Sequence, residues 1–267
     1  MKGLLVKPIF IGGSASPLNY SAAAASGQTV IVNLRYSWST DMGGAGTLPL
    51  PGTSEYTQFV NAAITTINSS VGVWGWEIGN EYNNPREFPL AGPLTPGAVV
   101  QTYNAIRAGC SGKRLCPGAL DPFNAQAGDP RDWLTSIYNY ISGAELVTAH
   151  GYIRGPDAAL VGSTAKFADW PLQWQYLNYP GCITALLDSL PWQFKALPVY
   201  VTEFNHLWKT VEGDWGWVND QRAADVVRAA YTAAQTCGFK GLALYRWACD
   251  EWALYNNQFV LNEVSNI

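Results

Sequence analysis

Strand-like and helix-like segments alternate along almost the whole chain of 267 residues, and this alternation limits the fold more than any other feature. The expected strands are apolar runs at residues 4–11, 29–37, 71–78, 114–120, 145–152, 199–204 and 241–248. The expected helices lie at residues 17–26, 53–70, 95–108, 131–141, 172–190, with a break near Pro180, and 219–236. Strands that alternate with helices form a parallel sheet, and continuous apolar runs suit a sheet that is buried on both faces. We therefore predict an α/β fold.

The closed (β/α)8 TIM barrel is the natural architecture for an alternating chain of this length. Only seven strands can be counted, and no clear helix follows the last one. The barrel is therefore expected to be trimmed, or to contain one element near a terminus that has no clear pattern. No internal repeat or second domain is visible, so residues 1–267 are predicted to form one domain.

Composition excludes several classes of partner. Charged residues make up 13% of the chain and the formal net charge is −4, so no nucleic-acid partner is expected. No apolar run reaches 18 residues, and no membrane span is expected. Lys7 and Pro8 interrupt the first apolar stretch, which we interpret as a strand rather than a signal peptide. The low charge and the many Ser, Thr and Asn residues favour a secreted protein, and the oligomeric state stays open.

The cysteines and histidines do not form a metal-binding pattern. None of the five Cys belongs to a Cys-x-x-Cys or Cys/His zinc motif. Cys110 and Cys116 flank a short turn and could form a disulfide, while the odd number leaves at least one thiol free. The chain has only two His, which excludes a multi-histidine centre, so no metal and no cofactor are expected.

Two glutamates follow strand-like runs and suggest the chemistry. Glu81 ends the stretch Trp-Gly-Trp-Glu-Ile-Gly-Asn-Glu directly after Asn80, and Glu203 ends the run that begins at Val199. Glycoside hydrolysis needs two carboxyl groups, one that protonates the leaving oxygen and one that attacks or activates water. The 12 Trp and 14 Tyr agree with sugar binding, because an aromatic ring offers a flat apolar surface to a pyranose. As Glu81 and Glu203 are 122 residues apart, only the fold can bring them together.

Further polar and aromatic residues lie at the ends of the expected strands, where active sites of α/β barrels are built. Candidates for substrate binding are Arg35, Trp38, Asn80, His150, Tyr152, Asn205, His206 and Trp247. His150 and Tyr152 alternate on one strand and should point to the same face, where one or both could hydrogen-bond the carboxylate of Glu203.

Glu77 is the internal rival of Glu81 as the catalytic acid. It lies four residues earlier, inside the expected strand, where a charge must be paired. Arg35 is a plausible partner, and we interpret Glu77 as a structural residue.

These residues resemble clan A of the glycoside hydrolases, a superfamily of retaining enzymes built on the (β/α)8 barrel. Asn80-Glu81 is similar to the pair that ends the clan's fourth strand, which implies that Glu81 is the acid/base. Glu203 matches the nucleophile of the seventh strand, Ala149-His-Gly-Tyr152 the sixth strand, and Tyr245-Arg-Trp247 the aromatic end of the eighth. The match covers about residues 29–250 and implies cleavage of β-glycosidic bonds in a poly- or oligosaccharide by double displacement.

Counted from the fourth strand, residues 29–37 are the third strand and residues 4–11 the second, so the first strand and helix of the clan are not found in this chain. Arg35 is then one strand away from the usual position of the clan's arginine. Two other functions stay open. A non-catalytic carbohydrate-binding protein on a degenerate barrel would bind sugars without hydrolysing them, and a metal-dependent barrel hydrolase would lose its activity to chelators.

Overall fold

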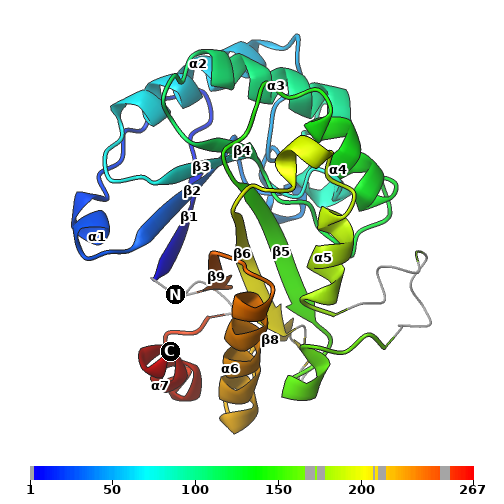
Figure 1. Cartoon of the computed structure of the whole chain (residues 1–267). Coiled ribbons are helices and arrows are strands. Elements are labelled where there is room, and N and C mark those ends of the chain that lie inside the picture. Colours follow the sequence, from blue (N-terminus) through cyan, green and yellow to red (C-terminus); the bar gives the residue numbers. More distant parts are fainter. Residues whose placement is uncertain (1–2, 166–171, 173–177, 207, 210–214, 247–252) are drawn as a thin grey trace. The chain divides into compact units, whose positions relative to one another are not determined.

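The computed structural model describes residues 3–165, 172, 178–206, 208–209, 215–246 and 253–267. The chain divides into two compact units (Figure 1). The first, called the N-terminal unit below, spans residues 2–148 and 189–198, and the second, the C-terminal unit, spans residues 149–188 and 199–267. The single catalytic domain expected from the sequence stays a prediction.

A parallel four-stranded sheet forms the centre of the N-terminal unit. Its strands follow the chain order β1 (Leu4–Phe10), β2 (Thr29–Arg35), β3 (Gly75–Ile78) and β4 (Leu115–Pro117). Its helices are α1 (Ser21–Ala25), α2 (Ser54–Ser69), α3 (Pro96–Ala108) and α4 (Pro130–Tyr138), with short 3-10 turns η1 (Thr40–Met42), η2 (Pro85–Glu87) and η5 (Trp192–Phe194). Every residue of β3 and β4 is buried, as expected for a parallel sheet covered by helices.

Side chains at the helix starts explain where α2, α3 and α4 begin. The hydroxyl of Thr53 accepts a hydrogen bond from the backbone N–H of Tyr56, and Thr95 does the same for Ala98. Asp129 caps α4 through the N–H of Arg131. Such caps satisfy N–H groups that have no partner within the helix.

The C-terminal unit contains a three-stranded sheet in the order β5 (Val147–Ile153), β6 (Val199–His206) and β9 (Gly241–Leu244). The first two residues of β5 belong to the N-terminal unit. The other elements of the C-terminal unit are η3 (Ala158–Leu160), α5 (Gly181–Leu187), α6 (Gln221–Thr236), α7 (Gln258–Asn266) and the two-residue strands β7 (Trp208–Lys209) and β8 (Trp215–Gly216). The apolar face of α6, with Val226, Val227 and Ala230, shares one buried cluster with Phe204 of β6 and Leu242 of β9.

Several element boundaries differ from the sequence-based expectations. The strand expected at 71–78 begins only at Gly75, because Val71 is half exposed and forms just an isolated bridge with Asn19. Of the helix expected at 172–190, the described part is α5, which begins at Gly181, directly after Pro180, while residues 173–177 lie outside the described residues. A helix does follow the last long strand, contrary to expectation. It is α7, whose first turn is capped by the side chain of Asn257.

Cys110 and Cys116, which the sequence allowed to form a disulfide, are both free cysteines. The thiol of Cys116 lies inside the sheet, 3.6 Å from the carbonyl oxygen of Trp76. Burial raises the pKa of the Cys110 thiol to about 11 and that of Cys116 well above its usual range. Both thiols therefore act as small apolar groups. None of the described helices has the length and hydrophobicity of a membrane-spanning segment.

Candidate active site

The strands of the N-terminal unit end in register. Leu34 of β2 pairs with Ile78 of β3, which in turn pairs with Pro117 of β4. The residues that follow these three strands therefore meet at one edge of the sheet. Asn80 and Glu81 lie at this edge, as the sequence predicted for the carboxyl end of a parallel sheet.

The turn between β3 and Glu81 depends on two glycines in close contact. Gly79 has a φ of 77°, a conformation that glycine adopts without strain. A Cβ atom on Gly118 would lie 2.3 Å from the carbonyl oxygen of Gly79, so only glycine lets the two backbones approach this closely. The side-chain amide of Asn33 donates to the same Gly79 oxygen over 2.7 Å. The turn is thus fixed from two sides.

Glu81 itself has a strained backbone. Its φ is 39°, and among the described residues no other non-glycine has a positive φ. The backbone N–H of Glu81 donates to the carbonyl oxygen of Ala119 over 2.7 Å, which holds it in this conformation. Backbone strain of this kind costs of order 1–3 kcal/mol and clusters at functional sites.

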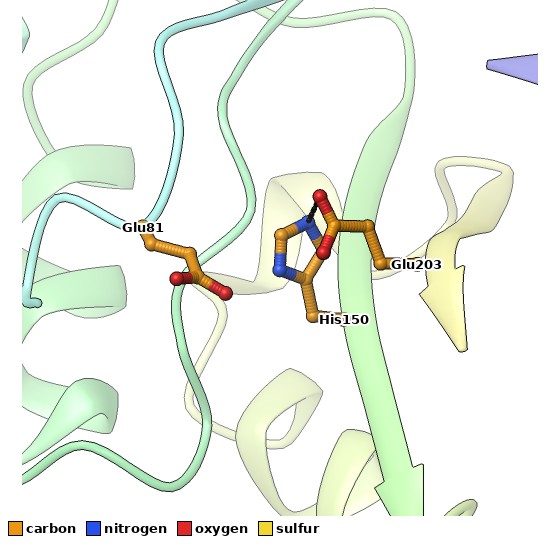
Figure 2. Close-up of side chains that lie close together, drawn as sticks. All are labelled: Glu81, His150 and Glu203. Atoms are coloured by element: carbon orange, nitrogen blue, oxygen red, sulfur yellow. Dashed lines mark ion pairs between the residues drawn. The ribbon is translucent and has the colours of Figure 1, made fainter. Parts of the chain in front are cut away.

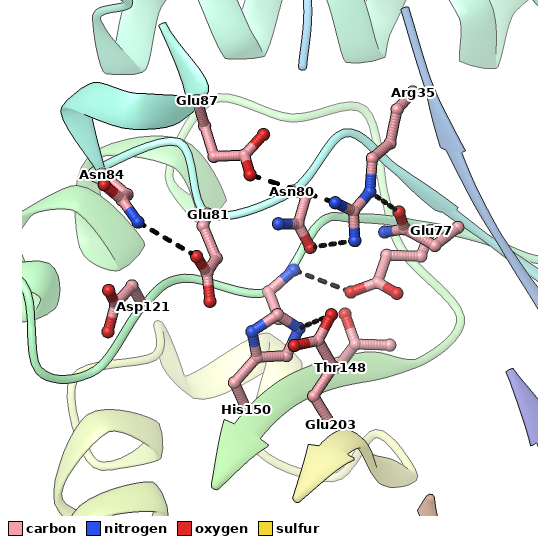
Figure 3. Close-up of polar contacts among 12 residues, drawn as sticks. Arg35, Glu77, Asn80, Glu81, Asn84, Glu87, Asp121, Thr148, His150 and Glu203 are labelled. Atoms are coloured by element: carbon pink, nitrogen blue, oxygen red, sulfur yellow. Dashed lines mark hydrogen bonds and ion pairs between the residues drawn. The ribbon is translucent and has the colours of Figure 1, made fainter. Parts of the chain in front are cut away.

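The carboxyl group of Glu81 is partly exposed and is oriented by its own loop. The side-chain amide of Asn84 donates to Oε2 of Glu81 over 3.2 Å (Figure 3). Asn84 also accepts from the N–H of Arg86 and so begins the turn η2. The same residue orients the acid and shapes the loop behind it.

A cationic network supports Asn80. Nη2 of Arg35 donates to Oδ1 of Asn80 over 2.8 Å, and the Nε group of Arg35 donates to Asn33. Nη1 of Arg35 lies 4.0 Å from Oε1 of Glu87, and both side chains are about nine-tenths buried (Figure 3). Arg35 therefore fixes the side chain of Asn80, and its charge is balanced by Glu87 of η2.

Glu77 is fully buried in β3, as expected for a residue in the wall of the sheet. Its Oε1 accepts a hydrogen bond from the N–H of Ala119 over 2.8 Å. Because β3 ends at Ile78 and Gly79 turns the chain, Glu81 does not continue the side-chain alternation of β3. The expected pairing of Glu77 with Arg35 stays a prediction.

Glu203 lies in β6 at an irregularity of the sheet. Val201 pairs with Leu242 and Phe204 with Leu244, so three steps along β6 correspond to two along β9. The extra residue is a β-bulge, a device that often redirects a side chain next to an active site. The side chain of Glu203 is 13% exposed, whereas its strand neighbours on both sides are buried.

The carboxylate of Glu203 contacts Tyr152 and His150, two side chains that point to the same face of β5. The hydroxyl of Tyr152 donates to Oε2 of Glu203 over 3.0 Å. Nε2 of His150 lies 3.7 Å from Oε1 (Figure 2). These contacts favour the ionised carboxylate, the form that a nucleophile needs.

Asn205 and His206 follow Glu203 but belong to β6 and are buried, so they do not form an exposed rim. Nε2 of His206 accepts a hydrogen bond from the N–H of Val218 over 3.2 Å, and its ring lies edge-on against Trp217. Desolvation by burial lowers the pKa of His206 to about 4. The substrate-binding roles of both residues stay predictions, and the contacts of His206 are those of a core residue.

Of the two tryptophans expected at the site, Trp38 is described by the structure. It is 42% exposed, and its ring stacks on Phe10 with the centroids 4.0 Å apart. Its outward surface is available to a sugar ring. Trp247 lies outside the described residues.

Sequence reasoning missed Asn33, Asn84 and Glu87, which orient the predicted residues. Asn33 could have been found from the sequence, because it lies two residues before Arg35 on β2 and its side chain points to the same face. No sequence pattern indicates Asn84 and Glu87, since they lie in an irregular loop whose path depends on its contacts with the loop after β4.

Solved structures of glycoside hydrolases resemble this chain. A family 39 glycoside hydrolase from Bacteroides cellulosilyticus WH2 has a TM-score of 0.57 and 16% identity, over 90% of this chain and 50% of that one. A family 5 xyloglucanase from Paenibacillus pabuli has a TM-score of 0.57 and 13% identity, over 99% of this chain and 86% of that one. A glycoside hydrolase family 30 subfamily 8 xylanase from Clostridium acetobutylicum has a TM-score of 0.52 and 15% identity, over 96% of this chain and 60% of that one.

These likenesses confirm the predicted fold class, an α/β TIM barrel. They support the resemblance to clan A glycosidases without resolving a family. The chain spans about half the length of the first of these structures. No protein-family model and no curated protein sequence matches it.

Proposed function

We propose that the protein is a retaining glycoside hydrolase that cleaves β-glycosidic bonds in a poly- or oligosaccharide. The observation that carries this proposal is the environment of Glu203, a partly exposed carboxylate at a β-bulge that receives a hydrogen bond from Tyr152 and has His150 beside it. The fold supports it, because the similar solved structures include a xyloglucanase, a xylanase and a β-mannanase.

In the proposed mechanism, the carboxyl groups of Glu81 and Glu203 act on the same glycosidic bond. Glu203 attacks the anomeric carbon while protonated Glu81 gives its proton to the departing oxygen. The bond to the leaving sugar breaks and a covalent glycosyl-enzyme forms. Glu81, now a carboxylate, takes a proton from water, whose oxygen attacks the anomeric carbon and releases Glu203. Retention requires a carboxyl separation of roughly 5–5.5 Å.

Asn80 is proposed to bind the sugar hydroxyl next to the anomeric carbon, a contact that strengthens in the transition state. The Arg35 network fits this role, because it fixes the amide of Asn80 before substrate binds. A carbohydrate polymer does not pass through a membrane, so we also propose that the protein acts outside the cell.

Replacement of the nucleophile tests the proposal. Glu203→Ala should abolish turnover of an activated aryl glycoside, and azide should restore it by attacking from the vacated side, with a glycosyl azide of inverted configuration as product. Glu55→Ala, at an exposed position in the first turn of α2, is the matched control and should keep full activity. Full activity of Glu203→Ala would reject the assignment.

The two alternative functions are tested with the same panel of aryl glycosides. A non-catalytic carbohydrate-binding protein would bind sugars tightly but hydrolyse none of the activated substrates. A metal-dependent hydrolase would lose its activity on treatment with a chelator and regain it with a divalent metal. The proposed mechanism predicts hydrolysis that a chelator does not change.

A further inference from the structure

A pocket of about 550 Å³ lies within the N-terminal unit, between the segment 85–96 and the segment 126–136. The first segment follows Glu81 and includes η2, and the second includes the first turns of α4. This volume is in the range of small-molecule binding sites. No residue of the proposed reaction lines this pocket.

The pocket has a rigid apolar wall. Phe88, Leu94 and Trp133 line it, together with Pro85 and Pro96. Trp133 is buried and its orientation is fixed, because its indole N–H donates to the carbonyl oxygen of Ala127 over 2.8 Å. A ligand that packs against this wall does not have to immobilise flexible side chains, which lowers the cost of binding.

Polar groups complete the lining. Thr95, Gln126, Asp132 and Ser136 offer hydroxyl, amide and carboxylate groups beside the apolar wall. A flat apolar surface with a few polar groups at its edge suits a pyranose, which has an apolar face and a rim of hydroxyl groups. The carboxylate of Asp132 accepts hydrogen bonds from hydroxyls and repels acidic groups, so a neutral sugar is favoured over a uronic acid.

The loops that build the pocket are the ones that position Glu81. Asn84, which donates to Glu81, directly precedes the pocket residue Pro85. The side-chain amide of Asn83 donates to the carbonyl oxygens of Asp121 and Asn124 over 2.8 and 2.9 Å and so ties the loop after β3 to the loop after β4. The pocket and the acid therefore belong to one hydrogen-bonded assembly.

We propose that this pocket is a distal subsite that binds a neutral sugar unit of an oligo- or polysaccharide, away from the bond that is cleaved. The inference rests on the proposed function for the class of ligand. It predicts that the protein binds long oligosaccharides more tightly than short ones.

The inactive variant Glu203→Gln makes this measurable without hydrolysis. The probes are β-linked gluco-, manno- and xylohexaose and the corresponding trioses. We expect at least one hexaose to bind at least tenfold more tightly than its triose, by calorimetry, and to shift the NMR signal of the Trp133 indole N–H, while the triose leaves that signal in place.

Ser136→Phe, added to the inactive variant, fills the pocket and should reduce hexaose affinity to the level of the triose. Thr65→Phe, which adds the same ring at an exposed position of α2, should leave the affinity unchanged. The double change Gln126→Ala with Asp132→Ala removes polar groups without adding bulk and should also weaken hexaose binding. This double variant still tests the pocket if the added ring of Ser136→Phe disturbs folding.

The proposal is overturned if no hexaose binds more tightly than its triose, if the Trp133 signal stays in place, or if the pocket variants bind like the control. Hydrolysis of aryl glycosides by the unaltered protein reports on the proposed function separately. Hydrolysis without an effect of the pocket changes rejects the subsite alone. Binding that depends on the pocket, without any hydrolysis, rejects the catalytic proposal alone.

Discussion

The hydroxyl of Tyr152 donates a 3.0 Å hydrogen bond to Oε2 of Glu203, and this bond joins neighbouring strands of one sheet. A hydrogen bond to a carboxylate is worth about 1.5–3 kcal/mol and stabilises its ionised form. The pair thus gives a direct test of how Glu203 is held ready for attack.

Tyr152→Phe removes this donor and leaves the ring. We expect kcat on an activated aryl glycoside to fall by about 10- to 100-fold, the range that corresponds to one such bond. Because the lost bond favoured the ionised form, the acidic limb of the kcat/KM profile should move to higher pH. Tyr231→Phe is the matched control, since it removes a tyrosine hydroxyl that donates to the carbonyl oxygen of Leu242. An unchanged pH profile for Tyr152→Phe would contradict the role.

The ion pair between Arg35 and Glu87 can be tested by its effect on stability. Arg35→Met leaves the buried carboxylate of Glu87 without this cation and should lower the free energy of unfolding by about 2–3 kcal/mol. Glu87→Gln in the same chain should recover part of that loss. Urea unfolding of the two single variants and the double variant measures the coupling. Additive effects would show that the two groups do not interact.

The close contact between Gly118 and Gly79 holds the turn that precedes Glu81, so a larger residue at position 118 should affect both stability and catalysis. Gly118→Ala places a methyl group where the Gly79 carbonyl lies, so the backbone of the turn must move. We expect a loss of about 2–3 kcal/mol in stability, the cost of an overpacked site, together with reduced kcat. Gly97→Ala is the control, because the nearest atom to its added Cβ is 3.9 Å away. A Gly118→Ala protein with normal stability and normal kcat would show that this contact is unimportant.

The outline of the fold could be predicted because hydrophobic pattern fixes strands and helices locally. Asn80 and Glu81 could be placed for the same reason, because they follow a buried strand, whereas Glu203 lies inside β6, which continues to His206. The alternation of His150 and Tyr152 also sufficed to place both side chains beside one carboxylate. These positions could be predicted from the alternation of side chains along a strand or from the position of a residue at the end of a strand.

The remaining features depend on contacts between segments far apart in the sequence. The bulge at Glu203 is defined only by the pairing of β6 with β9. Cys110 and Cys116 are close in sequence, yet Cys116 belongs to a buried strand and its thiol faces the Trp76 carbonyl. His206 was expected at the rim, but β6 extends through it and keeps it in the core. Such features are decided by tertiary pairing, which local pattern does not contain.

Burial of His206 predicts that the protein loses stability in mild acid. The pKa of His206 is lowered to about 4 in the folded chain by desolvation, compared with an ordinary value of 6.5. The unfolded chain therefore binds the proton more readily, and stability falls as the pH decreases from about 6.5 towards 4. The contribution of this residue should decrease by about 2.5 kcal/mol between pH 7.5 and pH 4.5.

Urea unfolding of the unaltered protein and of His206→Gln at these two pH values checks this prediction. Glutamine offers an oxygen to the N–H of Val218, which His206 now binds, but it does not titrate. The variant should be less stable than the unaltered protein at pH 7.5, and the difference should shrink or reverse at pH 4.5, because only the unaltered protein loses the histidine contribution. A difference that is the same at both pH values would mean that His206 does not titrate between them.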